Sequence, residues 1–401
     1  VSGIQKCYDK LLKSFGGFIN LRYKTDALHR PLKAAPPKTE NTIENSKGGL
    51  VLTLDKKIQI IAEQAANKIE KGAVVVMDCH TGDILAAVSR PTFDILKPEE
   101  SFENKDSPFI NRAFLPFSVG STFKLLTAAT ALEQGITPER AYCCNGNIKV
   151  GENIFNCHKL SGHGEINMHT ALKKSCNTYF ISLGIKVGGQ NLLFKAKRLG
   201  FGSPFFLAPD IATGSGNLPT EEDLLSDAAT ANFAFGQGAL TATPVQIACL
   251  ISAMANGGNA VTPRLIEGTT TDGAAFSSHT ARYSPQNIFL PSAAENVRRM
   301  MIEVVESGSG VKAKPEKFGA GGKTASAQSG QFVQGAEVVH AWFSGFYPAE
   351  NPQYSIVVLY EGGDSGGDMA CPVFKEICDG IGDYNIPTAV ENKISSVDAN
   401  N

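Results

Sequence analysis

The sequence lacks an excess of charge of either sign, and it lacks a long apolar run. Its 401 residues carry 37 Lys and Arg against 39 Asp and Glu, for a net charge of −2. This balance leaves no strong basic field and excludes nucleic acid as the expected partner. No apolar stretch is long enough to cross a membrane as a helix. Because the chain starts at Val1 instead of Met, we expect a fragment of a longer protein.

The sequence also lacks internal repeats and an even number of cysteines. Its nine Cys cannot all form disulfides with one another. A hydrophobic content of 42% and a charged content of 19% are typical of a globular protein. Composition divides the chain into three parts. Residues 1–48 are predicted to be the end of another module and a polar linker, 49–387 the folded domain, and 388–401 a frayed tail.

Strand patterns occur at both ends of the folded domain, with helical patterns between them. Two apolar runs flank the turn at residues 80–83 and predict a hairpin. Two further strands are predicted in "VVHAWFSGFYP" and "YSIVVLYEGG", followed by a helix in "CPVFKEICDGI". The pattern predicts an α+β fold in which one sheet joins the first hairpin to the last strands.

The segment from Ser121 to residue 134 reads as a helix that is apolar on nearly every side, yet it contains Lys124. Such a helix is usually buried, and a lysine is rarely buried without a partner. Ser121 and Lys124 are three residues apart and therefore share one helix face. Burial favours the neutral amine, which can take the proton of the serine hydroxyl and make a nucleophile for acyl transfer. This S-x-x-K pattern is common by chance, so it needs support from elsewhere.

Two further short motifs carry polar groups. Ser175 and Asn177 form an S-x-N triplet, in which the serine can relay a proton and the amide can bond a substrate; a helix N-cap is the plain alternative. Lys323 and Thr324 follow a glycine-rich stretch and can bind a carboxylate. A phosphate-binding loop would need glycine six residues before Lys323, where the sequence has Lys317, so the stretch does not fit such a loop.

Together, S-x-x-K, S-x-N and the Lys-Thr pair in this order resemble the motif set of penicillin-binding proteins and class A β-lactamases. Residues 49–382 resemble the transpeptidase domain of class B penicillin-binding proteins, including "FGQGALTATPVQIACLISAMANGG" and "VVHAWFSGFYPAENP". Residues 1–48 resemble the end of that family's non-catalytic pedestal. The resemblance implies a five-stranded antiparallel sheet covered by helices, together with a helical subdomain.

The resemblance also implies an activity, D,D-transpeptidation of peptidoglycan stem peptides, and covalent acylation by β-lactam antibiotics. Ser121 would be the nucleophile and Lys124 its base. Ser175 would pass a proton to the leaving group, and Asn177 would hold the acyl chain. Lys323 and Thr324 would bind the terminal carboxylate, and the backbone N–H groups of Ser121 and Ser326 would form the oxyanion hole. Catalysis would need no cofactor.

For the whole protein, the resemblance implies an N-terminal membrane anchor upstream of this chain and an extracytoplasmic catalytic domain. A membrane glycosyltransferase would be its partner in cell-wall synthesis, whether for elongation, division or sporulation. One residue departs from the family pattern, since Ala325 stands where the third motif usually has glycine. A methyl group facing the Ser121 helix is expected to narrow the site and to reduce acylation by bulky β-lactams.

Cysteines and histidines gather just before Ser175. Cys144 and Cys157 flank a predicted hairpin, and His163 follows in a glycine-containing loop, so these three are predicted zinc ligands. His158 or Cys143 would supply a further ligand. A Cys144–Cys157 disulfide and free thiols are the alternatives that the spacing leaves open. If zinc is present, it should brace the loop that carries Ser175 and take no part in the chemistry.

Three other functions are compatible with the motifs. A D,D-carboxypeptidase or a β-lactamase would use the same nucleophile, and a β-lactam sensor domain would become acylated without acting on stem peptides. A class A β-lactamase needs a glutamate to activate the deacylating water. The nearest candidates, Glu221 and Glu222, lie in surroundings unlike the E-x-x-x-N loop of that enzyme. The transpeptidase is therefore the favoured prediction.

Overall fold

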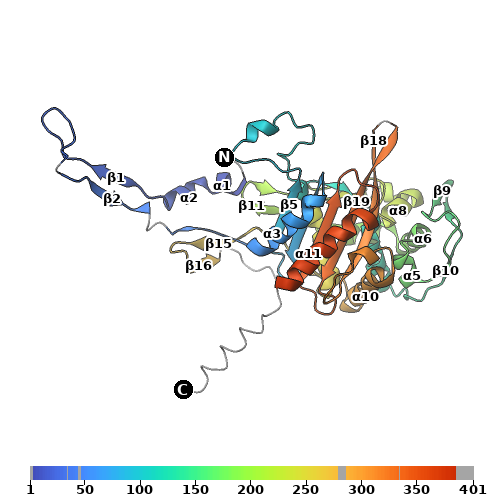
Figure 1. The fold of residues 1–401 in the computed structure, drawn as a ribbon. Coiled ribbons are helices and arrows are strands. Elements are labelled where there is room, and N and C mark those ends of the chain that lie inside the picture. Colours follow the sequence, from blue (N-terminus) through green and yellow to red (C-terminus); the bar gives the residue numbers. More distant parts are fainter. Residues whose placement is uncertain (1–2, 34, 44–46, 279–285, 334, 385–401) are drawn as a thin grey trace, which may run out of the picture. The chain divides into compact units, whose positions relative to one another are not determined.

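Figure 1 shows a computed structural model of the chain, which describes residues 3–33, 35–43, 47–278, 286–333 and 335–384. The chain divides into two compact units. The first comprises Val1–Thr53, Phe206–Ala212 and Arg264–Arg282, and the second comprises the rest of the chain. The predicted tail at 388–401 lies outside the described residues.

The first unit is built from short elements. Two helices, α1 (Gly3–Cys7) and α2 (Asp9–Ser14), precede the antiparallel pair β1 (Ile19–Arg22) and β2 (Lys38–Asn41). A three-stranded sheet joins β3 (Gly49–Leu52), β15 (Ile266–Thr270) and β16 (Phe276–Ser278), and β11 (Phe206–Ala208) pairs with β12 (Ile211–Ala212). The unit therefore includes two segments distant in sequence from its N-terminal part, which composition alone did not assign to it.

The second unit is organised around a five-stranded antiparallel sheet. Its strand order is β18-β19-β20-β4-β5. The strands are β4 (Gly72–Asp78), β5 (Ile84–Arg90), β18 (Gly321–Val333), β19 (Ala336–Tyr347) and β20 (Tyr354–Tyr360). Val358 of β20 lies opposite Val74 of β4, so the first hairpin joins the last strands, as predicted. This order leaves β18 at one edge of the sheet.

Helices cover both faces of this sheet. On one face lie α3 (Lys56–Ala65) and α11 (Cys371–Tyr384), side by side in Figure 1. Alternate strand residues point toward them because side chains alternate across a strand. The resulting core contains Ile58, Ala62, Val74, Val76, Ile356, Val358, Phe374 and Ile377. Asp55 caps α3 by accepting hydrogen bonds from the backbone N–H groups of Lys57 and Ile58.

The other face carries α9 (Pro244–Ala255) against β4, β19 and β20, and α10 (Pro291–Ser307) against β18. Every residue of α9 is buried. The helical region beyond contains α4 (Lys124–Glu133), α5 (Met168–Lys173), α6 (Asn177–Val187), α7 (Gly189–Arg198) and α8 (Asp227–Ala234). Among the described residues, no helix has the length and apolar character needed to span a membrane.

Short strand pairs complete the second unit and bring distant loops together. β6 (Phe117–Ser118) pairs with β13 (Thr241–Ala242), and β14 (Asn259–Ala260) pairs with β17 (Gln286–Asn287). β8 (Asn147–Val150) and β9 (Asn153–Asn156) form the predicted hairpin between Cys144 and Cys157. β7 (Tyr142–Cys144) pairs with β10 (Gly164–Ile166), which sets Cys144 beside the loop of His163.

Candidate active site

Ser121 lies on the short helical turn η5 (Gly120–Phe123), which runs directly into α4. The turn is fixed by its neighbours. Gly120 has a φ of 62°, and its N–H donates to the carbonyl of Gly236 at 2.9 Å. A Cβ at this position would lie 3.0 Å from the Ala327 methyl, so glycine lets η5 approach β18 closely. Ser121 is half-buried and lines a cleft of about 480 Å³.

Lys124 is fully buried in the first turn of α4. Its Nζ donates to the Asn177 side-chain oxygen at 2.7 Å and to the Ser175 carbonyl at 2.9 Å, and it lies 3.4 Å from the Ser175 hydroxyl. These partners are neutral, so they bind the amine without stabilising its charge as a carboxylate would. Burial lowers the pKa of Lys124 to about 7. A substantial fraction of the amine is therefore neutral at pH 7 and can act as a base.

Ser175 holds an unusual backbone conformation between α5 and α6. Its φ of 54° lies in the left-handed region, which non-glycine residues adopt at a cost of about 1–3 kcal/mol. Its hydroxyl accepts a hydrogen bond from Lys323 Nζ at 2.9 Å and lies near Lys124 on the other side. The hydroxyl thus bridges two amines, which suits a proton relay between them.

Lys323 lies on the edge strand β18 and is also fully buried. Burial, and secondarily the nearby amine of Lys124, lowers the pKa of Lys323. Thr324 follows it on β18, and the Thr324 hydroxyl shares a 2.8 Å hydrogen bond with the hydroxyl of Ser309. Ser326, two residues farther along β18, lines the same cleft as Ser121. The three predicted motifs are therefore brought together in one site.

Ala325 is 3% exposed and packs between two glycines, Gly120 and Gly366. A Cβ at Gly120 would lie 3.4 Å from the Ala325 methyl. On the other side, a Cβ at Gly366 would lie 2.6 Å from the Ala325 carbonyl oxygen. The methyl group is thus set directly against the turn that carries Ser121, and two glycines leave room for this strand.

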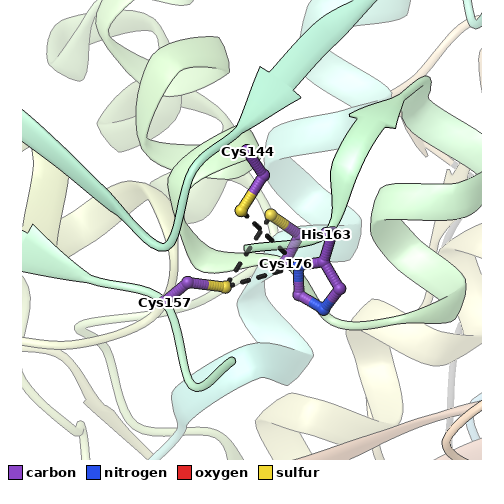
Figure 2. Close-up of side chains that lie close together, drawn as sticks. All are labelled: Cys144, Cys157, His163 and Cys176. Atoms are coloured by element: carbon purple, nitrogen blue, oxygen red, sulfur yellow. Dashed lines mark hydrogen bonds between the residues drawn. The ribbon is translucent and has the colours of Figure 1, made fainter. Parts of the chain in front are cut away.

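The cysteine and histidine cluster lies behind the S-x-N triplet. Figure 2 shows Cys144, Cys157, His163 and Cys176 directed toward one another. Their ligating atoms all lie within 4.8 Å of one another, and the three sulfurs are buried. The His163 Nδ1 is 3.6 Å from Cys144 Sγ and 3.5 Å from Cys157 Sγ. All nine cysteines of the chain are free thiols in the structure.

The fourth member of the cluster is Cys176, the middle residue of the S-x-N triplet. The sequence had predicted His158 or Cys143 in this place. Cys143 is exposed and contacts Asn145, so its thiol points away. His158 lies at the margin, with its Nδ1 3.9 Å from Cys157 Sγ, and lines the cleft. The spacing of the cysteines in the sequence did not identify Cys176 as a ligand. Ser175 and Asn177 line the cleft, whereas Cys176 between them is buried in the cluster, and this difference arises from the chain conformation at the start of α6.

The sulfur of Cys157 lies 3.9 Å from that of Cys176. This contact lowers the pKa of the Cys157 thiol and raises that of Cys176. Burial also lowers the pKa of His163, which favours its neutral imidazole. A thiolate and a neutral imidazole are the forms in which these groups bind a metal.

Several residues that line the cleft lie outside the three short motifs of Ser121, Ser175 and Lys323. They include Lys174, Phe235, Gln237, Ser309, Gln328 and Asp364. The α8–β13 loop carries Gln237, and the chain beyond α10 carries Ser309. Phe235 and Gln237 begin the stretch at 235–258 that resembles the family, but their place in the cleft, like that of the other residues, follows from tertiary packing around β18.

Comparisons with known proteins identify the family to which the chain belongs. The sequence profile of the penicillin binding protein transpeptidase domain matches residues 72–379. The chain is 30% identical to the peptidoglycan D,D-transpeptidase MrdA of Acinetobacter baumannii, over 98% of this chain and 61% of that protein. It is also 30% identical to the stage V sporulation protein D of Bacillus subtilis, over 94% of this chain and 59% of that protein.

Solved structures show the same fold. The D,D-transpeptidase domain of a peptidoglycan glycosyltransferase from Eggerthella lenta superposes with a TM-score of 0.78 at 25% identity, covering 96% of this chain and 88% of that one. The ceftriaxone acyl-enzyme complex of penicillin-binding protein A from M. tuberculosis gives a TM-score of 0.75 at 26% identity, covering 83% and 80%.

The chain belongs to the penicillin-binding protein transpeptidase domain family. It spans about three fifths of the length of the curated relatives described above. The family resemblance found in the motifs is thereby confirmed, together with the predicted sheet and its helices.

Proposed function

We propose that this chain is a serine D,D-transpeptidase that cross-links peptidoglycan stem peptides and is acylated by β-lactams at Ser121. One observation carries the proposal: two fully buried lysines meet at the hydroxyl of Ser175, which lines the same cleft as Ser121, and neither lysine has a carboxylate partner among the described residues. Buried amines that depend on neutral partners are costly for stability, so their presence together supports a catalytic use. The transpeptidases among the relatives support the same reaction.

The proposed chemistry has two steps. Lys124 takes the proton of Ser121, whose oxygen attacks the carbonyl of the D-Ala-D-Ala bond, while the N–H groups of Ser121 and Ser326 bind the oxyanion. The C–N bond breaks, and Ser175 passes a proton to the departing amine of D-Ala. The amine of a second stem then attacks the ester and passes its proton through Ser175 and Lys124 to the Ser121 oxygen, so that the ester C–O bond breaks, the new amide forms and Ser121 is regenerated. Lys323 and Thr324 bind the terminal carboxylate, and Asn177 holds the acyl chain.

Intact mass after incubation with a penicillin tests this assignment. We expect a stable adduct of one penicillin per chain, which is lost in Ser121→Ala and retained in the control Ser203→Ala. Rapid hydrolysis of the drug without an adduct would instead identify a β-lactamase.

A stem peptide that ends in D-Ala-D-Ala then separates the remaining alternatives. Cross-linked product identifies a transpeptidase, release of D-Ala alone a carboxypeptidase, and no reaction a sensor domain.

The cleft itself favours transfer over β-lactam hydrolysis. Glu221, one of the two candidates for activating a deacylating water, forms an ion pair with Lys197 at 3.1 Å. Neither Glu221 nor Glu222 lines the cleft, and Asp364 is the sole carboxylate among its described lining residues. The site therefore offers no glutamate placed as a class A β-lactamase requires.

We further propose that Cys144, Cys157, His163 and Cys176 hold a structural Zn²⁺. Three sulfurs and one imidazole nitrogen are a typical tetrahedral zinc ligand set. Their close approach around one point fits such an ion, whereas a Cys144–Cys157 disulfide would leave Cys176 unused. Because Cys176 lies between Ser175 and Asn177, the metal would hold both catalytic side chains in place and take no part in bond making.

Elemental analysis of the purified protein tests the zinc site. We expect one zinc per chain and a lower melting temperature after treatment with a chelator. A protein without zinc, whose melting temperature a chelator leaves unchanged, would contradict the proposal and favour free thiols.

For the full protein, we propose an anchor in the cell membrane, an extracytoplasmic catalytic domain and a glycosyltransferase partner. The similarity to proteins that span more sequence than this chain supports this view. On the same basis, residues 1–48 would belong to a pedestal that precedes the transpeptidase domain. Co-purification of the full-length protein with a membrane glycosyltransferase is the direct test.

A further inference from the structure

Asp364 lies in the catalytic cleft but has no part in the proposed reaction. It is exposed and follows β20 on the loop that leads to the helical turn η8 (Gly366–Ala370). Neighbouring carboxylates are already engaged. Glu361 pairs with Arg112, Asp368 pairs with Lys312 at 2.6 Å, and Glu337 accepts a hydrogen bond from Gln328. In the described part of the chain, the Asp364 carboxylate forms no ion pair, and the residue lines the cleft.

The loop of Asp364 is fastened to the strand that carries the motif residues. The N–H of Gly366 donates to the Ser326 hydroxyl at 3.5 Å, and a Cβ at Gly366 would lie 2.2 Å from the Trp342 carbonyl oxygen. The N–H of Asp364 itself contacts the sulfur of Met369 at 3.3 Å. These contacts hold the backbone of the Asp364 loop beside Ser326, in the cleft that both residues line.

The edge strand sets the direction in which an extended peptide would bind. β18 pairs with β19 on one side, and its other edge borders the cleft. An extended chain laid along such an edge advances about 3.3 Å per residue and exchanges backbone hydrogen bonds with the strand. With its terminal carboxylate at Thr324 and its reacting carbonyl at Ser326, the preceding residue of the donor passes toward Gln328. That path runs beside the loop of Asp364.

We propose that Asp364 binds the side-chain ammonium group of the donor stem, on the residue that precedes D-Ala-D-Ala. This inference rests on the proposed transpeptidase function. Because the acceptor amine of the reaction belongs to a stem of the same kind, a donor stem also carries such an amine. A primary alkyl amine is protonated at neutral pH, so it seeks a carboxylate. The subsite thus selects donor stems whose side-chain amine is free.

The experiment compares two synthetic donors that end in D-Ala-D-Ala, one with a free side-chain amine and one with that amine acetylated. Acylation rates are measured by mass spectrometry, and their free-to-acetylated ratio is taken within each protein variant, so a general loss of activity cancels. For a solvent-exposed ion pair, we expect a ratio of about three to five in the unmodified chain. The ratio should fall to about one in Asp364→Asn and in high salt.

Asp368→Asn is the matched control, since it removes the same charge from the adjacent turn and should keep the ratio. A ratio near one in the unmodified chain, or an unchanged ratio in Asp364→Asn, would overturn the proposal. If Asp364→Asn keeps the donor ratio but slows transfer to a separate amine-bearing acceptor, the carboxylate serves the acceptor, and the donor assignment is wrong. Absence of a penicillin adduct at Ser121 would instead reject the transpeptidase function itself.

Discussion

Two polar regions meet at the triplet Ser175–Cys176–Asn177, and they differ in how their buried groups are satisfied. On one side, Lys124 and Lys323 donate to oxygens of Ser175 and Asn177 at hydrogen-bond distances of 2.7–2.9 Å. On the other, Cys176 joins sulfurs and an imidazole that contact one another at 3.5–3.9 Å. The first region is complete as it stands, whereas the second is spaced as a ligand set around a central point.

This difference fits the two tasks that we propose for these regions, acid–base chemistry and metal binding. Burying the amines of Lys124 and Lys323 lowers the stability of the folded state, but it favours their neutral form near a nucleophile, as acid–base chemistry requires. The sulfur side would gain stability when a metal binds, because such sites couple metal binding to folding. Changes on the lysine side should therefore affect rate, and changes on the sulfur side should affect stability first.

Replacing the buried base should give the largest effect. In Lys124→Ala, we expect penicillin acylation to slow by about 10²- to 10⁴-fold, because the serine proton loses its acceptor. The measurement is the second-order rate of adduct formation by intact mass. Lys186→Ala, which removes an exposed lysine from α6, serves as the control. A rate within tenfold of the unmodified chain would show that Lys124 is not the base.

Replacing Cys176, the proposed zinc ligand inside the triplet, should distinguish the role of the cysteine cluster from that of the two lysines. In Cys176→Ala, we expect loss of the bound zinc and a fall in melting temperature of about 5 °C or more, since a structural metal stabilises the folded state. Calorimetry and elemental analysis check both. Cys143→Ala removes an exposed thiol outside the cluster and should change neither. Equal effects of the two variants would refute the assignment of the four ligands.

Lowering the pH should slow the acylation of Ser121, because Lys124 becomes protonated. Because we propose the neutral amine of Lys124 as the base and its pKa is about 7, acylation should rise with pH through about 7. Below that pH, the rate should fall up to tenfold per pH unit as the amine becomes protonated. Rates of penicillin acylation between pH 5.5 and 8.5 test this. A profile that is flat across this range would place the titrating group elsewhere.

The Ala325 methyl should give the smallest effect. In Ala325→Gly, we expect acylation by a bulky β-lactam to rise about three- to tenfold relative to a small one, because one methyl group in a pocket discriminates by that order. The ratio of the two acylation rates is the measured quantity. Ala336→Gly, which removes an exposed methyl at the start of β19, is the control. An unchanged ratio in Ala325→Gly would mean that the methyl does not limit access.

The predictions from sequence were most accurate where the chemistry is local. The hairpin of β4 and β5 followed from apolar runs around a turn, and the burial of α4 followed from its lack of a polar face. Cys144 and Cys157 were expected to meet because a hairpin separates them, and β8 and β9 form it. The fourth member of the cluster was missed, because spacing does not reveal which way Cys176 points.

The sequence by itself determined the sheet, the buried helix and the three motifs, since periodicity, burial and residue type are properties of the chain. Tertiary structure decided which side chains meet. It joined Lys124 and Lys323 at one hydroxyl, turned Cys176 toward the sulfurs, and set Asp364 beside the edge strand. The physical reason is that contacts between loops distant in sequence depend on how helices pack against the sheet, and no local pattern encodes that packing.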